Sequence, residues 1–136
     1  MASPLPVVAR EIQIVDDQGN LRMALSAKSG NPTIELMRAN GGSSAVIALD
    51  EAGRPSLKLR NPDTRGPVSV IEIDENGAHV KLDRPGGGSS YLFLNNAGGS
   101  GVVLIDLSGA RRLEVLVAPD GSPRIARYGP DGKALS

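Results

Sequence analysis

Cysteine is absent from this chain of 136 residues, and aromatic residues and histidine are scarce. The lack of cysteine excludes disulfides and thiolate metal sites. The aromatic residues are Tyr91, Phe93 and Tyr128, with no tryptophan, so Val, Ile and Leu must fill any interior. His79 is the only histidine, which disfavours a histidine-based metal site or a catalytic base and is typical of an exposed polar residue.

The chain also lacks an excess of charge and a long hydrophobic run. Fifteen basic residues balance fifteen acidic ones, which argues against nucleic acid or an anionic membrane as a partner. The longest run of large aliphatic residues is Val102–Ile105, far too short to insert in a membrane. Residues 1–10 contain no basic segment and are interrupted by proline, unlike a secretory signal. We therefore expect a cytoplasmic protein by default, while a virion or injection-apparatus component would have the same features.

Glycine, by contrast, recurs about every eleven residues along almost the whole chain. The series is Gly19, Gly30, Gly41, Gly53, Gly66, Gly77, Gly88, Gly98, Gly109, Gly121 and Gly132. The segments between these glycines are short apolar–polar alternations, too short for ordinary helices. This spacing predicts short β-strands joined by tight turns.

Two of these intervals make a longer repeat of 22–23 residues. The strand starts at Glu11, Thr33, Ser56, His79 and Gly101 are followed by similar alternating segments, and a weaker start lies at Pro123. Each unit reads as a β-hairpin plus the turn into the next hairpin. Such a period is typical of repeats that bury their apolar faces against neighbours.

Many of the turns share the pattern Asp-x-x-Gly. The aspartate can accept a hydrogen bond from the backbone two residues later, and the glycine adopts a positive φ at little cost. The residues that we predict to define the turns are Asp16 and Gly19, Asp50 and Gly53, Asp74 and Gly77, and Asp106 and Gly109.

The strands alternate between aliphatic and polar residues, as in a half-buried antiparallel sheet. Ile34 and Leu36, for example, flank Glu35. Residues 91–94 and 102–105 are apolar on both faces of the strand. We therefore expect a neighbouring subunit to cover the apolar side chains that the sheet's own core leaves exposed.

We predict an all-β fold: an antiparallel meander of about eleven short strands, with residues 1–10 as an extended segment and 11–136 as one β-repeat domain. Scarce aromatics and the short period favour an oligomeric β-prism, in which several copies share a core. A closed monomeric β-barrel and a solenoid are the alternatives, whereas an isolated open sheet would invite aggregation.

No catalytic, cofactor or metal site emerges from the pattern. Turn aspartates could form a column along one edge, but the Gly-Gly-x-Gly-x-Asp calcium repeat and the Asp-x-Asp-x-Asp-Gly loop are both absent. The glycine-rich segment 85–90 precedes a strand rather than the helix that a phosphate-binding loop requires. We expect no cofactor and no metal.

Read as consecutive hairpin units, residues 11–134 resemble the tandem β-hairpin repeats of some bacterial proteins. They are also similar to the stalk repeats of trimeric phage and viral fibres. The resemblance implies an elongated, trimeric assembly.

Together these features predict a non-catalytic structural or assembly protein, homo-oligomeric with three copies favoured. The expected interface residues are Tyr91, Leu92, Phe93, Leu94, Val102, Val103, Leu104 and Ile105. The segment at residues 1–8 is a further candidate for attachment to a larger assembly. The alternative function is a monomeric β-barrel that binds a small ligand in a cavity lined by Tyr91 and Phe93.

Overall fold

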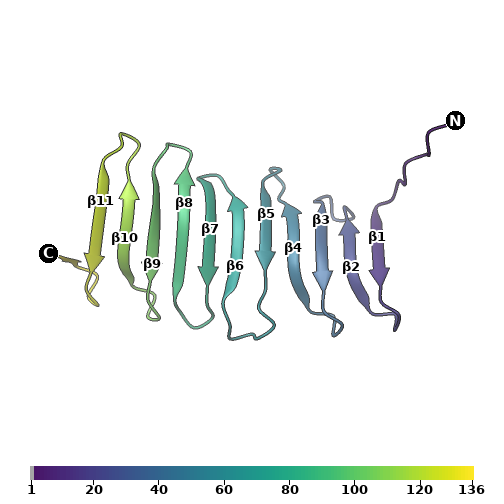
Figure 1. Cartoon of the computed structure of the whole chain (residues 1–136), viewed down its shortest axis with the longest axis horizontal. Helices are drawn as coiled ribbons and strands as arrows, with labels where there is room; N and C mark the ends of the chain where they lie inside the picture. Colours follow the sequence, from purple (N-terminus) through teal and green to yellow (C-terminus); the bar gives the residue numbers. More distant parts are fainter. Residues whose placement is uncertain (1) are drawn as a thin grey trace.

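The computed structural model describes residues 2–136 and consists of one antiparallel β-sheet whose twelve strands follow each other in sequence order (Figure 1). Residues 2–10 precede the sheet without regular secondary structure. The strands are β1 (Glu11–Val15), β2 (Leu21–Ser26), β3 (Thr33–Met37), β4 (Ser43–Leu49), β5 (Pro55–Leu59), β6 (Val68–Ile73), β7 (Gly77–Asp83), β8 (Ser89–Asn95), β9 (Ser100–Ile105), β10 (Arg111–Val117), β11 (Pro123–Tyr128) and β12 (Ala134–Leu135). The predicted all-β meander is confirmed, and the two-residue β12 adds one strand to the number expected.

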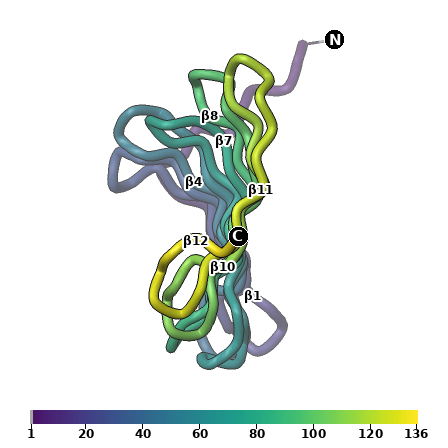
Figure 2. Tube along the Cα trace, turned by 90° about the vertical axis from the view of Figure 1, so that its left-hand side faces the viewer, coloured from purple at the N-terminus to yellow at the C-terminus, as the bar shows by residue number. Residues whose placement is uncertain are grey.

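The sheet is open. In the described part of the chain each strand pairs only with its neighbours in sequence, so β1 and β12 are its two edges. Figure 2, viewed along the row of strands, shows a single twisted layer. The closed monomeric barrel and the solenoid are therefore wrong as descriptions of this chain.

The strand register explains why the sheet does not close. Ile12 in β1 is connected to Ile125 in β11 by a series of cross-strand partners, one residue in each strand. Each of these residues lies near the middle of its strand. Closing a barrel requires the strands to shift steadily along one another. These strands do not shift steadily along one another. The hairpin repeats are nearly equal in length, so each new strand lies beside the same part of the strand before it.

Most of the turns have a common geometry. At Asp16 the backbone N–H of Gly19 donates to the aspartate carbonyl oxygen at 2.9 Å, and Gly19 has a φ of +83°. The β5–β6 connection, residues 60–67, is longer, and its Gly66 does not have a positive φ. The β6–β7 turn is shorter, because Asp74 N–H donates to the carbonyl oxygen of Gly77 itself. Gly77 has a φ of +146°, and a Cβ there would lie 2.3 Å from the carbonyl oxygen of Leu94, so only glycine fits.

The chain has almost no core of its own. Among residues 2–136, Val103 at 2 % exposure and Glu114 at 1 % are the only buried residues other than three glycines. This part of the chain also contains no helix long and apolar enough to cross a membrane. Because the sheet is a single layer, both of its faces are surfaces of the chain.

Candidate functional site

The register separates the strand residues cleanly into two faces. One residue from each of β1–β11 forms a continuous line across the middle of one face, which we call the central row. Every member is a large aliphatic residue: Ile12, Leu25, Ile34, Ile47, Leu57, Ile71, Val80, Leu92, Val102, Val115 and Ile125.

A flanking row runs on each side of the central row, two residues away along the strands. The first flanking row, from β3 to β9, is Leu36, Ala45, Leu59, Ser69, Leu82, Ser90 and Leu104. The second, from β6 to β11, is Ile73, Ala78, Leu94, Ser100, Val117 and Pro123. Both rows alternate between large and small or compact residues, and the two alternations are out of phase.

The alternation has a simple origin in the sequence. Most strands from β4 to β11 begin on this face with a small or compact residue such as Ala, Ser or Pro and continue with a large aliphatic one. Neighbouring strands run in opposite directions. The small residue at the start of a strand therefore lies in the first flanking row in even-numbered strands and in the second flanking row in odd-numbered strands. Each of the strands β6–β9 therefore has one large and one small flanking residue.

We call the three rows together the aliphatic face. Within β1–β10 they contain no charged residue. Apart from half-buried Leu57, the central-row side chains are 36–72 % exposed. With the exception of Val15, every exposed large hydrophobic side chain of β1–β11 belongs to this face or, in the case of Ile14 and Leu49, extends its flanking rows. Contiguous apolar surface of this extent is unusual on a monomeric protein and typical of an interface.

The structure divides the eight expected interface residues between the two faces. Leu92, Leu94, Val102 and Leu104 lie on the aliphatic face, whereas Tyr91, Phe93, Val103 and Ile105 lie on the opposite, polar face. Val103 needs no neighbouring subunit to cover it, because side chains of β8 and β10 already do. Tyr91 and Phe93 line an open groove on the polar face, with no barrel cavity behind them.

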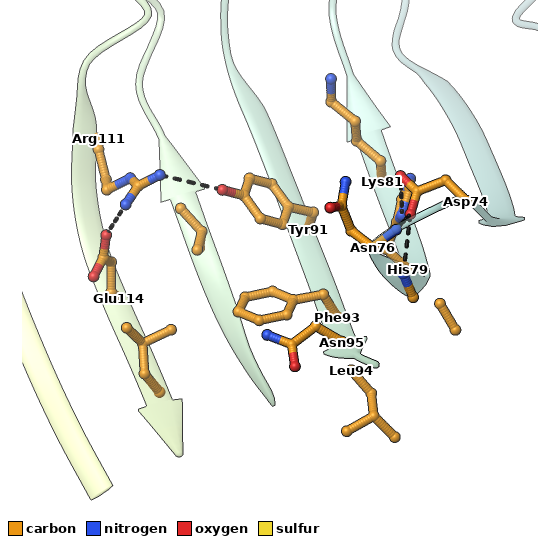
Figure 3. Close-up of a pocket in the computed structure, with 14 residues that line it drawn as sticks. Asp74, Asn76, His79, Lys81, Tyr91, Phe93, Leu94, Asn95, Arg111 and Glu114 are labelled. Carbon is orange, nitrogen blue, oxygen red and sulfur yellow. Dashed lines mark hydrogen bonds and ion pairs between the residues drawn. The ribbon is translucent and has the colours of Figure 1, made fainter. Parts of the chain in front are cut away.

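That groove, with a volume of about 560 Å³, lies over β7–β10 (Figure 3). Gly101 leaves room for Leu116 and Phe93 to lie across β9: a Cβ at Gly101 would come within 2.4 Å of Leu116 and 3.2 Å of Phe93. At one side, Glu114 accepts hydrogen bonds from Arg111 and, at 2.8 Å, from Arg124. The bond to Glu114 is the main cause that raises the pKa of Arg111. These contacts make a small outer cluster that stabilises β8–β11.

At the other side of the groove, His79 lies between two carboxylates. Its Nε2 is 2.9 Å from Glu72 on the paired strand, and its Nδ1 is 3.8 Å from Asp74. One potential ligand atom from each of the three residues lies within 4.8 Å of the others. Because each ring nitrogen faces a carboxylate, the imidazole links the Glu72 and Asp74 side chains across the hairpin. Sequence reasoning missed it; folding residues 72–79 as a hairpin would have placed Glu72 opposite His79.

The turn aspartates accept most of their hydrogen bonds from their own turns. The pKa values of Asp16, Asp50, Asp74 and Asp106 all lie below the ordinary value, chiefly through hydrogen bonds from Asn20, Arg54, Asn76 and Ser108, respectively. A column of all these aspartates along one edge, considered above as a possibility, does not form. Successive turns of a meander lie at opposite ends of the strands, so Asp16 and Asp106 lie along one long edge and Asp50 and Asp74 along the other (Figure 1).

No protein-family model matches this chain, and no curated protein matches it.

Proposed function

We propose that this protein is a non-catalytic structural or assembly protein that self-associates through its aliphatic face. The observation that carries the proposal is the uncovered aliphatic face, with its central row unbroken from Ile12 to Ile125. Burial of apolar surface is the main favourable contribution to protein association. A sheet with this face in water would be poorly stable and prone to aggregate.

The surface area supports the same proposal. The chain exposes 9593 Å², whereas a compact monomer of 14.1 kDa exposes about 6,700 Å². Extended residues 2–10 account for at most about 1,300 Å² of the difference. The remaining excess of about 1,600 Å² is twice the roughly 800 Å² that each partner buries in a standard interface.

The pattern of side-chain sizes favours a second copy as the partner. When the first flanking row of one copy meets the second flanking row of another at the same level, Ser69 faces Ile73 and Leu82 faces Ala78. Each large residue then meets a small one. A face without charged residues in β1–β10 also gives an oppositely charged partner nothing to recognise.

The test compares two adjacent substitutions on β5 that point to opposite faces. Leu57→Asp introduces a charge into the central row, while Lys58→Asp introduces one on the polar face. We expect Leu57→Asp to abolish assembly and Lys58→Asp to keep the wild-type mass in light scattering after size exclusion. Equal masses for all three proteins, with strand content retained by circular dichroism, would contradict the proposal.

A further inference from the structure

The sizes of the side chains on the aliphatic face also describe the cross-section of the assembly. The central row contains only large aliphatic residues, whereas at the levels of β6–β9 the meeting of two flanks supplies one large and one small residue. A slab between two flat sheets has a uniform gap of about 10 Å. On the aliphatic face, large side chains fill the middle, and each flank has room for only one large and one small residue where two copies meet. The space to be filled is therefore deep in the middle and narrow at both sides, as it is between three sheets that form a triangle.

We propose that three copies of this chain form a three-sided prism, with the three central rows meeting on its axis; this inference rests on the self-association proposed above. The three-fold axis runs along the row of strands, so the three chains point in the same direction. At each corner the first flanking row of one copy meets the second flanking row of the next. The prism is about 50 Å long, since adjacent strands lie about 4.8 Å apart.

The strand lengths fit this geometry. Most strands have five to seven residues, which corresponds to about 17–24 Å. In an equilateral triangle with sides of this length, the centre lies about 5–7 Å from each side. Three aliphatic side chains, one from each sheet, fill such a space at every level. The three-fold symmetry brings three copies of the same residue together on the axis, where three aromatic rings would collide. In agreement with this, Tyr91 and Phe93 lie on the polar face, away from the axis.

The composition of the flanks distinguishes a corner from an open margin. The margins of a two-layer sandwich are accessible to water and accept Lys, Arg or Glu, whose charged ends reach the solvent. Within β3–β9 the first flanking row contains only Leu, Ala and Ser. Closed corners exclude charged side chains because charges there would lose their hydration without gaining a partner.

The twist of the sheet is compatible with the prism. The strands rotate steadily about the direction in which they are stacked, as Figure 2 shows along that direction. Three sheets that twist about one shared axis keep their aliphatic faces in contact along the full length. The three N-terminal segments, residues 2–10, then leave the prism together at one end.

The test exchanges a large and a small residue within β6. Ser69→Ile places two isoleucines at each corner, and Ile73→Ser leaves two serines there. The double variant Ser69→Ile/Ile73→Ser again gives one of each per corner, but only if the two rows of neighbouring copies meet at the same level. We expect each single change to raise the dissociation constant at least about tenfold and the double change to restore most of it.

Native mass completes the test. Wild type and the double variant should have a mass of about 42 kDa, three times the 14.1 kDa of one chain. A mass of about 28 kDa, or a double variant as weak as the single ones, would overturn the prism and leave self-association intact. A folded species of 14 kDa would overturn the proposed function as well. Ser56→Ile, on the polar face of β5, is the matched control and should change nothing.

Discussion

Val103 and Glu114 are cross-strand partners on the polar face, and apart from three glycines they are the only buried residues in the described chain. The one place where this sheet builds a core without help is thus on the outside of the proposed assembly. Arg111, Arg124, Leu116 and Phe93 supply the cover. The outer cluster and the aliphatic face are therefore separable by mutation.

Glu114→Gln tests the outer cluster. The substitution removes the negative charge that Arg111 and Arg124 share, and it leaves a buried amide between two cations. Because both arginines are more than half exposed, we expect a loss of about 1–2 kcal/mol in unfolding free energy, less than for a fully buried pair. Urea unfolding measures it. Native mass should not change, and a variant as stable as wild type would contradict this assignment.

Gly101→Ala tests the close packing across β9. The added Cβ would lie 2.7 Å from the carbonyl oxygen of Val115, which is backbone and cannot simply rotate away. We expect a destabilisation of about 1–3 kcal/mol. Gly99→Ala is the control: the nearest atom to its added Cβ is the end of a side chain, the Asn95 amide nitrogen at 3.0 Å, rather than backbone. Equal unfolding midpoints for the two variants would argue against the packing described.

The turn aspartates predict how stability depends on pH. Their pKa values are lower in the folded chain than the ordinary 3.8, so the folded state prefers them ionised. Their stabilisation is complete well above pH 3.8 and is lost as the pH falls through the lower folded values. We expect the urea midpoint to decline below about pH 4.

Asp50→Asn and Asp106→Asn separate the charge from the turn geometry. Asparagine already occupies the equivalent position in the β8–β9 turn, where Asn95 Oδ1 accepts from Gly99 N–H at 2.8 Å. The double variant should fold at neutral pH and show a shallower loss of stability in acid. An unchanged acid profile would indicate that other groups control it.

Much of the fold was predictable because the information is local. The glycine spacing and the Asp-x-x-Gly turns indicate hairpins, and alternation indicates one aliphatic side. Whether the sheet closes depends on the accumulated shift between strands, which no single turn reveals. The sheet stays open because the shift does not accumulate: Ile12 and Ile125, at the two ends of the central row, both lie near the middle of their strands.

The candidate site was less accessible from the sequence for the same reason. Residues 91–94 and 102–105 are apolar throughout, so alternation alone does not say which side chains share a face. The register does: it places Phe93 with Gly101 and Leu92 with Val102. It also reveals the out-of-phase flanking rows and the pairing of Glu72 with His79.

The central claim is that copies of this chain cover its aliphatic face and thereby complete its core. The dependence of unfolding on protein concentration tests it most directly, because assembly and folding are then one equilibrium. Urea midpoints measured over a hundredfold range of concentration should rise steadily, and the chain should lose its strand signal when diluted far enough. A cooperative unfolding transition at the same urea concentration throughout, from a particle of 14.1 kDa, would contradict the account.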